Sequence, residues 1–467
     1  MATNLTIKKL WMYFRQAVSG KHQDFTSGSI RKAVFMLSVP MILEMLMESI
    51  FAVVDIFYVS QVSVNAVATI GLTESVITLV YAVAIGLSMA ATAVVARRIG
   101  EKDKEGASRA AVQVIFLGVL VSVVISAVGI LYPKEILGLM GGSPDLIEEG
   151  YGYTKVLLAG NLTIMLLFLI NSIFRGAGDA SIAMWTLILS NGLNIILDPI
   201  FIFGMGPVPE FGVEGAAIAT TIGRGSAVVF QLLVLFFGWS RIKIGFRDLV
   251  FRTQVMLNLI KISLGGIGQF IIGTSSWVFL MRIMSEFGSE VLAGYTIAIR
   301  VVMFTLMPAW GMSNAAATLV GQNLGAKNPE RAEKSVWKTG KYSAIFMGIV
   351  SLAYLLFAEQ IIMLFSTVPD VIKNGALCLR IIALGYVAYA YGMVAINSFN
   401  GAGDTKTPTW INFICFWMIQ LPLAYVTAIY LDFGPVGVFS AITFAEILIA
   451  IIGIYWFRKG HWKSVDV

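Results

Sequence analysis

Hydrophobic segments long enough to cross a lipid bilayer recur along the whole chain, and they restrict the fold more than any other feature. Of the 467 residues, 58% are hydrophobic and only 13% are charged. An apolar run of about 20 residues spans the hydrocarbon core as a helix. We find twelve such runs, at about 33–59, 66–96, 111–132, 151–174, 182–204, 215–239, 257–284, 291–320, 340–365, 376–399, 408–431 and 434–457. The composition therefore predicts an all-α membrane protein with twelve transmembrane helices.

The net charge of +6 is concentrated in a few of the segments between these runs. Lysine and arginine gather in the segment before the first run, after the second, sixth and eighth runs, and at the C-terminus. Cytoplasmic loops carry such an excess of basic residues, so we expect both termini to be cytoplasmic. This topology explains the charge without a nucleic-acid partner.

The two halves of the chain resemble each other at one constant offset in residue number. Residues 86–100 align without gaps to residues 311–325, and at the same offset Gly176-Ala-Gly-Asp179 aligns to Gly401-Ala-Gly-Asp404. Matches at one offset over half a chain indicate duplication. Six runs in each half return the chain to the same side of the membrane, so the halves should form two six-helix lobes related by a pseudo-two-fold axis along the membrane normal. We expect both aspartates to cap the helices that follow them.

The repeat sets the expected domain organisation. We assign residues 1–32 to a cytoplasmic N-terminal segment, 33–239 to an N-lobe, 240–256 to a cytoplasmic linker, 257–457 to a C-lobe and 458–467 to a cytoplasmic tail. Two parallel lobes leave a cleft between them that rocking can open to either side.

Polar side chains share one face in two spans of the first half. These are Glu44, Glu48 and Asp55 in the first span, and Asn191, Asn194 and Asp198 in the fifth. At about 100° per residue, each set falls within roughly 60°. A carboxylate at bilayer depth is costly unless it faces protein or water, so these acids are candidate functional residues. Hydrogen bonding between helices is the alternative role, although a neutral amide would serve it at lower cost.

The second half lacks these acids. At the offset of the repeat, Glu44 pairs with Gln269, Asp55 with Leu280 and Asp198 with Leu423. An ionisable cluster confined to one lobe is typical of a coupled transporter. No nucleotide-binding motif is present, so active transport would draw on an ion gradient.

Five stretches of the chain resemble the multidrug and toxic compound extrusion (MATE) family. They are Val53-Val-Asp-Ile-Phe-Tyr-Val59, Ala96-Arg-Arg-Ile-Gly100 with Asp103-Lys-Glu-Gly-Ala107, Phe174-Arg-Gly-Ala-Gly-Asp179, Gly192-Leu-Asn-Ile-Ile-Leu-Asp-Pro-Ile-Phe201 and Gly212-Val-Glu-Gly-Ala-Ala-Ile-Ala-Thr220. The chain resembles the prokaryotic DinF-like branch, whose acids lie in the N-lobe. The resemblance implies a prokaryotic plasma (inner) membrane protein that exports drugs in exchange for H⁺ or Na⁺.

The resemblance also implies the site residues. The coupling residues of the branch fall on Asp55, Asn194, Asp198 and Thr220, whose hard oxygen atoms suit Na⁺ and whose carboxylates could carry a proton. For the substrate cavity we predict Glu44, Glu48, Asn171, Asn191, Gln269 and Arg300. The chain departs from the branch at Glu44 and Glu48, where small or amide residues are expected.

These observations predict a secondary active antiporter for cationic or amphipathic organic compounds. We expect no enzymatic activity, no cofactor besides H⁺ or Na⁺ as coupling ion, and function as a monomer in the lipid bilayer. The alternative is a flippase for lipid-linked precursors, which shares the architecture. Such a protein should carry basic residues in its cleft, and often extra helices.

Overall fold

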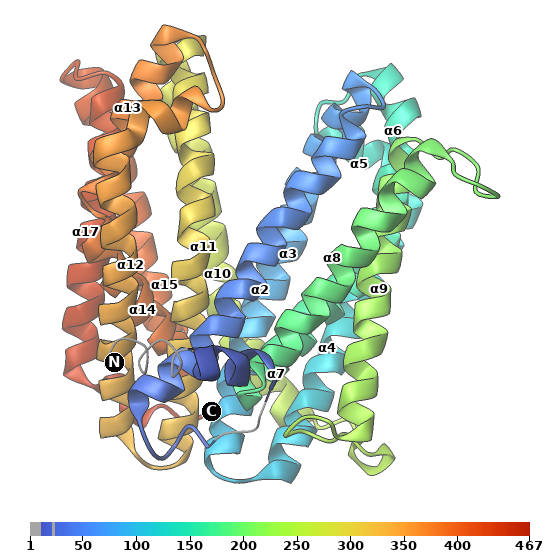
Figure 1. Ribbon diagram of the computed structural model, residues 1–467, viewed down its shortest axis with the longest axis vertical. Coiled ribbons are helices and arrows are strands. Elements are labelled where there is room, and N and C mark those ends of the chain that lie inside the picture. The colour runs from blue at the N-terminus through green and yellow to red at the C-terminus, as the bar shows by residue number, and fades with distance from the viewer. Residues whose placement is uncertain (1–10, 21–23) are drawn as a thin grey trace.

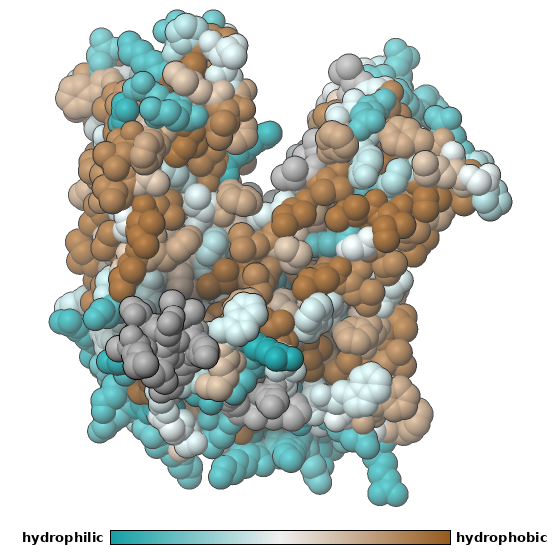
Figure 2. All heavy atoms as spheres, in the orientation of Figure 1, coloured by the Kyte–Doolittle hydropathy of each residue, from teal (hydrophilic) through white to brown (hydrophobic). Residues whose placement is uncertain are grey.

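The computed structural model describes residues 11–20 and 24–467, with only the backbone described for residues 52, 53, 55, 56 and 64. The described residues contain helices and no strands. The helices form two lobes, which pack together at the end where the C-terminus lies and diverge toward the other end (Figure 1). Apolar side chains cover the middle of both lobes between polar ends, as expected of a membrane-spanning surface (Figure 2).

The N-lobe contains eight helices of the described chain. They are α2 (Ile30–Val59), α3 (Val64–Gly100), α4 (Lys104–Leu131), α5 (Pro133–Leu139), α6 (Pro144–Ala159), α7 (Asn161–Ala177), α8 (Ala180–Phe203) and α9 (Val213–Phe237). The segment from 238 to 252 then leads to the C-lobe and packs on the N-lobe, where Ile242 and Ile244 are buried in its core.

The C-lobe repeats this order. Its helices are α10 (Thr253–Met284), α11 (Ser289–Gly325), α12 (Pro329–Met363), α13 (Pro369–Ala383), α14 (Tyr386–Ala402), α15 (Lys406–Asn412), α16 (Leu421–Tyr425) and α17 (Pro435–Lys459). A π-helical segment, Phe413–Gln420, joins α15 to α16, and a second one, Val426–Tyr430, extends α16, so that together they form one apolar span.

Twelve spans result when two bent helix pairs are each counted once. In the described chain ten helices are long and apolar enough to cross a membrane, and the pairs α6–α7 and α13–α14 bring the number to 12. This confirms the predicted all-α architecture. The two pairs bend by 40° and 60°.

The bends occur at equivalent glycines of the repeat. Gly160 lies between α6 and α7, and its counterpart in the second half, Gly385, lies between α13 and α14. A Cβ on Gly160 would lie 2.7 Å from the side chain of Thr221, and one on Gly385 would lie 3.0 Å from the side chain of Thr443. Because glycine has no side chain, each bend can lie close to the last helix of its lobe, α9 or α17.

Pairs of glycines also bring the lobes together around the pseudo-two-fold axis. A Cβ on Gly86 of α3 would lie 2.6 Å from the backbone nitrogen of Ile267 in α10. A Cβ on Gly311 of α11 would lie 2.8 Å from the backbone nitrogen of Ile42 in α2. The two contacts are equivalent, because the repeat aligns Gly86 to Gly311 and Ile42 to Ile267. Such close backbone approach leaves no room for a side chain, which explains glycine at both positions.

The N-terminal segment is held by the opposite lobe. Arg331, near the start of α12, donates hydrogen bonds to the backbone carbonyls of Phe25, Ser27 and Gly28, which precede the N-lobe helix α2. The buried ring of Phe25 also lies 5.3 Å from the Arg241 guanidinium. The segment therefore bridges the two lobes at the end where the C-terminus lies.

The C-terminal tail makes the reciprocal contact. Arg97, at the end of the N-lobe helix α3, donates to the carbonyl of Val465 over 2.8 Å. Lys463 pairs with Glu333 of the C-lobe at 2.6 Å, and Trp462 is buried. Each end of the chain thus joins its own lobe to the other one.

The two repeated aspartates differ in role. Asp404 accepts hydrogen bonds from the backbone N–H and hydroxyl of Thr407, so it caps α15 as predicted. The capping prediction is wrong for Asp179, which makes no side-chain cap to α8. Its carboxylate instead accepts the backbone N–H of Arg241 at 2.7 Å. The segment after the N-lobe folds back and supplies this partner.

Candidate functional site

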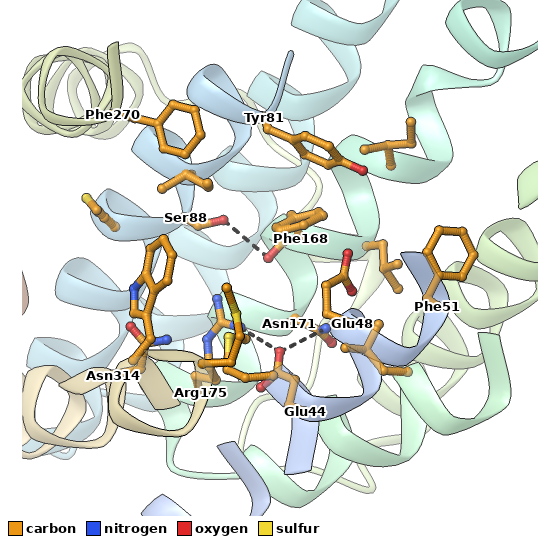
Figure 3. Close-up of a pocket in the computed structure, with 18 of the residues that line it drawn as sticks. Glu44, Glu48, Phe51, Tyr81, Ser88, Phe168, Asn171, Arg175, Phe270 and Asn314 are labelled. Carbon is orange, nitrogen blue, oxygen red and sulfur yellow. Dashed lines mark hydrogen bonds and ion pairs between the residues drawn. The ribbon is translucent and has the colours of Figure 1, made fainter. Parts of the chain in front are cut away.

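A cavity of about 470 Å³ lies between the lobes and is lined by both of them. Figure 3 shows charged and polar side chains of α2 and α7 opposite aromatic side chains. The N-lobe contributes most of the lining, and the C-lobe contributes residues of α10, α11 and α14. Aromatic residues from both lobes form much of the wall: Phe51, Tyr81, Tyr153, Phe168, Phe270 and Trp310. Such a wall suits flat apolar molecules.

A buried ion pair closes one part of the cavity. The Arg175 guanidinium of α7 donates from Nη1 to Oε1 of Glu44 in α2 over 2.6 Å. The same oxygen accepts a hydrogen bond from Asn171, and Asn171 accepts one from Gln231 of α9. The Glu44 side chain is only 1% exposed. This network ties three helices of the N-lobe together.

A second acid–base pair on the same face of α2 is looser. Oε1 of Glu48 lies 4.0 Å from Nη2 of Arg224 in α9, and the Glu48 side chain is 32% exposed. Arg224 also lies over the Phe51 ring, 4.8 Å from its centroid, and donates to the Tyr81 hydroxyl over 3.3 Å. All four residues line the cavity.

Three of the predicted coupling residues meet inside the N-lobe. Asn194 of α8 donates from Nδ2 to the Asp198 carboxylate over 3.0 Å and to the Thr220 hydroxyl of α9 over 3.3 Å. All three side chains are buried, and Thr220 also lines the cavity. Asp55 belongs to α2, which packs against α8, but its side chain lies outside the described residues.

This cluster offers hard oxygen donors and one described carboxylate. In the part of the chain that the structure describes, no group of three or more His, Cys, Asp or Glu side chains could hold a metal ion. A monovalent cation needs less charge than such a group supplies, and carboxylate, amide and hydroxyl oxygens suit hard cations. The donor set therefore fits Na⁺ or a proton as a transported ion.

The predicted cavity residues divide into two groups. Glu44, Glu48 and Asn171 line the cavity, whereas Asn191, Gln269 and Arg300 do not. Asn191 donates to the backbone carbonyl of Met47 over 2.7 Å, and Gln269 pairs with Asn400 in the C-lobe. Arg300 is exposed on α11, where its charge interacts with Glu74.

Three charged residues of the cavity wall were not predicted from the sequence: the buried Arg175 and Arg224, and Glu74. Arg175 follows Phe174 at the end of a span and belongs to the motif at residues 174–179 that carries the family resemblance. Arg224 interrupts an apolar run, which is itself a signal, because an intramembrane charge needs a partner or a polar cavity. The cavity wall therefore carries both signs of charge.

Comparison with known proteins agrees with this architecture. The MatE family model matches residues 40–200 and 267–426, once in each half. The "Probable multidrug resistance protein NorM" of Thermotoga maritima is 28% identical over 438 residues, which cover 93% of this chain and 94% of that protein.

Solved structures of the family superpose over nearly the whole chain. The structure titled "Crystal structure of MATE in complex with MaL6" has a TM-score of 0.87 and 29% identity, covering 93% of this chain and 97% of that one. An outward-facing multidrug resistance MATE transporter gives the same score and identity, with 93% and 96% coverage. Since the family model accounts for more than half of its length, the chain belongs to the MatE family of membrane transporters.

Proposed function

We propose that the protein is a secondary active exporter of cationic or amphipathic organic compounds, driven by inward movement of H⁺ or Na⁺. One observation carries the proposal. Thr220 accepts a hydrogen bond from Asn194 of the buried cluster and also lines the cavity between the lobes. An ion bound at the cluster can therefore change the shape and charge of the substrate site directly. The name of the Thermotoga maritima relative, which refers to multidrug resistance, supports the same class of cargo.

The coupling cluster consists of Asp55, Asn194, Asp198 and Thr220. A proton or Na⁺ neutralises the carboxylate charge of this cluster. The change then reaches α2, which packs against both α8 of the N-lobe and α11 of the C-lobe. Pro40 removes one backbone hydrogen bond from α2 and provides a bend point. Ion binding can thus alter the contact between lobes.

The orientation follows from the basic segments. The loops at 101–103 and 326–328 and the segment from 238 to 252 lie at the end of the molecule that holds the C-terminus (Figure 1). By the positive-inside rule, this end lies on the cytoplasmic side of a prokaryotic plasma membrane. The space between the lobes opens toward the opposite end (Figure 2). In this account the structure is an outward-open state of a monomer.

One observation favours the flippase alternative. A flippase should carry basic residues in its cleft, and Arg175 and Arg224 do line the cavity. Both, however, face glutamates, at 2.6 Å and 4.0 Å. Three glutamates and two arginines among the lining residues leave the wall without the positive excess that a phosphate group needs. The relatives named for multidrug resistance also favour export.

The proposal is tested with purified protein in sealed liposomes that contain ethidium. A pH gradient and a Na⁺ gradient are imposed separately, and dye movement is followed by fluorescence. We expect one gradient to drive dye movement and the other to have little effect. Dye that moves with neither gradient would contradict the proposal, and a labelled lipid-linked precursor would then be the next cargo to test.

A further inference from the structure

A short helix at residues 11–18 precedes α2, and its outer face is both apolar and basic. Trp11, Met12 and Arg15 are exposed and fall within about 100° of one another around the helix. Ala17, on the opposite side, is buried, whereas Trp11 is 66% exposed. An outer face that combines tryptophan, another large apolar residue and arginine is typical of helices that lie on a membrane surface.

A hydrogen bond fixes this helix to the N-lobe. Trp185 of α8 donates from its indole N–H to the carbonyl of Val18 over 3.0 Å. A Cβ on Gly20 would lie 2.7 Å from the hydroxyl of Ser181 in the first turn of α8. Figure 1 shows the helix in dark blue, lying across the long axis of the lobes and above the loops of the end that holds the C-terminus. The helix therefore lies against the side of α8.

The repeat indicates the depth of this contact in the membrane. Trp185 aligns to Trp410 of α15, and the two side chains are 48% and 64% exposed. Residues related by an axis along the membrane normal lie at the same depth. Each tryptophan lies about 6–8 Å along its helix from the cytoplasmic end. Exposed tryptophans at this depth are typical of the interface between membrane and water, so the helix that is bonded to Trp185 lies at the same interface.

The surroundings of the helix are basic. Residues 11–20 contain Arg15 and no acidic residue. The first turn of α2 adds the exposed Arg31, and Lys32, whose amine lies 5.5 Å from an aromatic ring of the helix. The Asp24 carboxylate, which is the next one along the chain, accepts hydrogen bonds within its own turn. A guanidinium binds phosphate oxygens with two parallel hydrogen bonds, and the cytoplasmic leaflet is rich in anionic phospholipids.

We propose that the helix at residues 11–18 is a binding surface for anionic phospholipids of the cytoplasmic leaflet. Trp11 and Met12 enter the boundary between headgroups and acyl chains, and Arg15 binds the headgroup phosphate. Arg31 and Lys32 attract the net negative charge of these lipids and disfavour the ammonium group of zwitterionic ones. The inference concerns the membrane and is independent of the exported compound.

Brominated phospholipids, which quench tryptophan fluorescence on contact, test the inference. Purified protein is reconstituted into two sets of vesicles with the same mixture of phosphatidylglycerol and phosphatidylcholine. Only the phosphatidylglycerol is brominated in the first set, and only the phosphatidylcholine in the second. The signal of Trp11 is the difference between the wild type and Trp11→Phe. Trp410→Phe gives the reference for lipid contact, and Trp462→Phe gives the reference for a fully buried ring.

We expect lipid to quench Trp11 about as strongly as Trp410 and to leave Trp462 unquenched. At Trp11, brominated phosphatidylglycerol should quench more strongly than brominated phosphatidylcholine. Arg15→Gln should lower this preference by about fivefold, the effect of one basic residue near an anionic surface. Arg282→Gln is the matched control, because Arg282 is exposed at the far end of α10 and forms its ion pair there.

Two results would overturn the inference. In the first, neither brominated lipid quenches Trp11 more than it quenches Trp462, which would place the helix in water. In the second, both lipids quench Trp11 equally and Arg15→Gln has no effect, which would exclude recognition of the lipid charge. If Trp11→Phe does not fold, Met12→Trp supplies a second probe on the same face. Its added fluorescence must then show the same preference for phosphatidylglycerol, and equal quenching by the two lipids overturns the inference.

Discussion

Arg175 and Glu44 form a 2.6 Å ion pair at the position where the other lobe has a neutral amide pair. Their counterparts in the repeat are Asn400 and Gln269, which exchange two hydrogen bonds of 2.9 Å and 3.1 Å. The two lobes therefore use the same helix–helix contact with different chemistry. In the N-lobe the contact is charged and faces the cavity, and in the C-lobe it is uncharged.

The amide pair suggests a substitution test of the ion pair. Arg175→Asn alone leaves the Glu44 carboxylate buried without its counter-charge, and breaking a buried pair in this way costs about 3–5 kcal/mol. We expect a large fall in thermal stability in detergent. The double variant Glu44→Gln, Arg175→Asn copies the C-lobe pair and should recover most of the stability. A double variant as unstable as the single one would contradict this account.

Gly86 and Gly311 should respond alike to substitution. An added Cβ would lie 2.6 Å and 2.8 Å, respectively, from backbone nitrogen in the other lobe. Overpacking of this kind costs about 1–3 kcal/mol, so Gly86→Ala and Gly311→Ala should each loosen the contact between lobes. Spin labels on α3 and α10 would report the separation. Gly273→Ala is the control, because nothing lies within 4 Å of its added Cβ.

Thr220 and Thr221 provide a matched pair of variants. The Thr220 hydroxyl accepts from Asn194, whereas the Thr221 hydroxyl donates within its own helix to the carbonyl of Ala217. Thr220→Val should raise the concentration of driving ion needed for half-maximal transport by about two- to tenfold, the range for one hydrogen bond. Thr221→Val should leave it unchanged. Equal effects of the two variants would exclude Thr220 from the ion site.

Arg331 should protect the N-terminal segment from proteolysis. Its guanidinium donates to three backbone carbonyls between Phe25 and Gly28. Arg331→Gln removes most of these bonds, so trypsin should cleave the segment faster at its basic residues. Lys334→Gln, which alters an exposed pair on the same helix, is the control. Equal cleavage rates in both variants would show that other contacts hold the segment.

The sequence predicted the spans and the repeat because hydropathy and self-alignment depend on residue type alone. The bends at Gly160 and Gly385 lie inside continuous apolar runs, so hydropathy gave no sign of them. The two aspartates at 179 and 404 share a motif but differ in role, because only the first is met by a returning segment with Arg241. That difference depends on tertiary contacts.

The site was predicted in part for a similar reason. Helical periodicity predicted that Asn194 and Asp198 share one face of their span, and the family resemblance predicted Thr220. In the structure the three residues form one cluster. Of the cavity charges, the sequence predicted Glu44 and Glu48 but not Arg175 and Arg224. In the last helix of each half, the alignment of Phe211-Gly212 with Phe433-Gly434 carries Arg224 of α9 onto Glu446 of α17. Under this alignment both halves have a charged residue at the same position of the last helix, with opposite sign.

We propose that the ion cluster and the cavity act on each other through the N-lobe. The most direct test measures ethidium binding to purified protein while pH and Na⁺ concentration are varied separately, for the wild type and for Asp198→Asn. We expect that one of the two ions weakens dye binding in the wild type and that this effect is lost in Asp198→Asn, with the protein still folded. Binding that responds to the ion equally in both proteins would contradict the assignment of the coupling site.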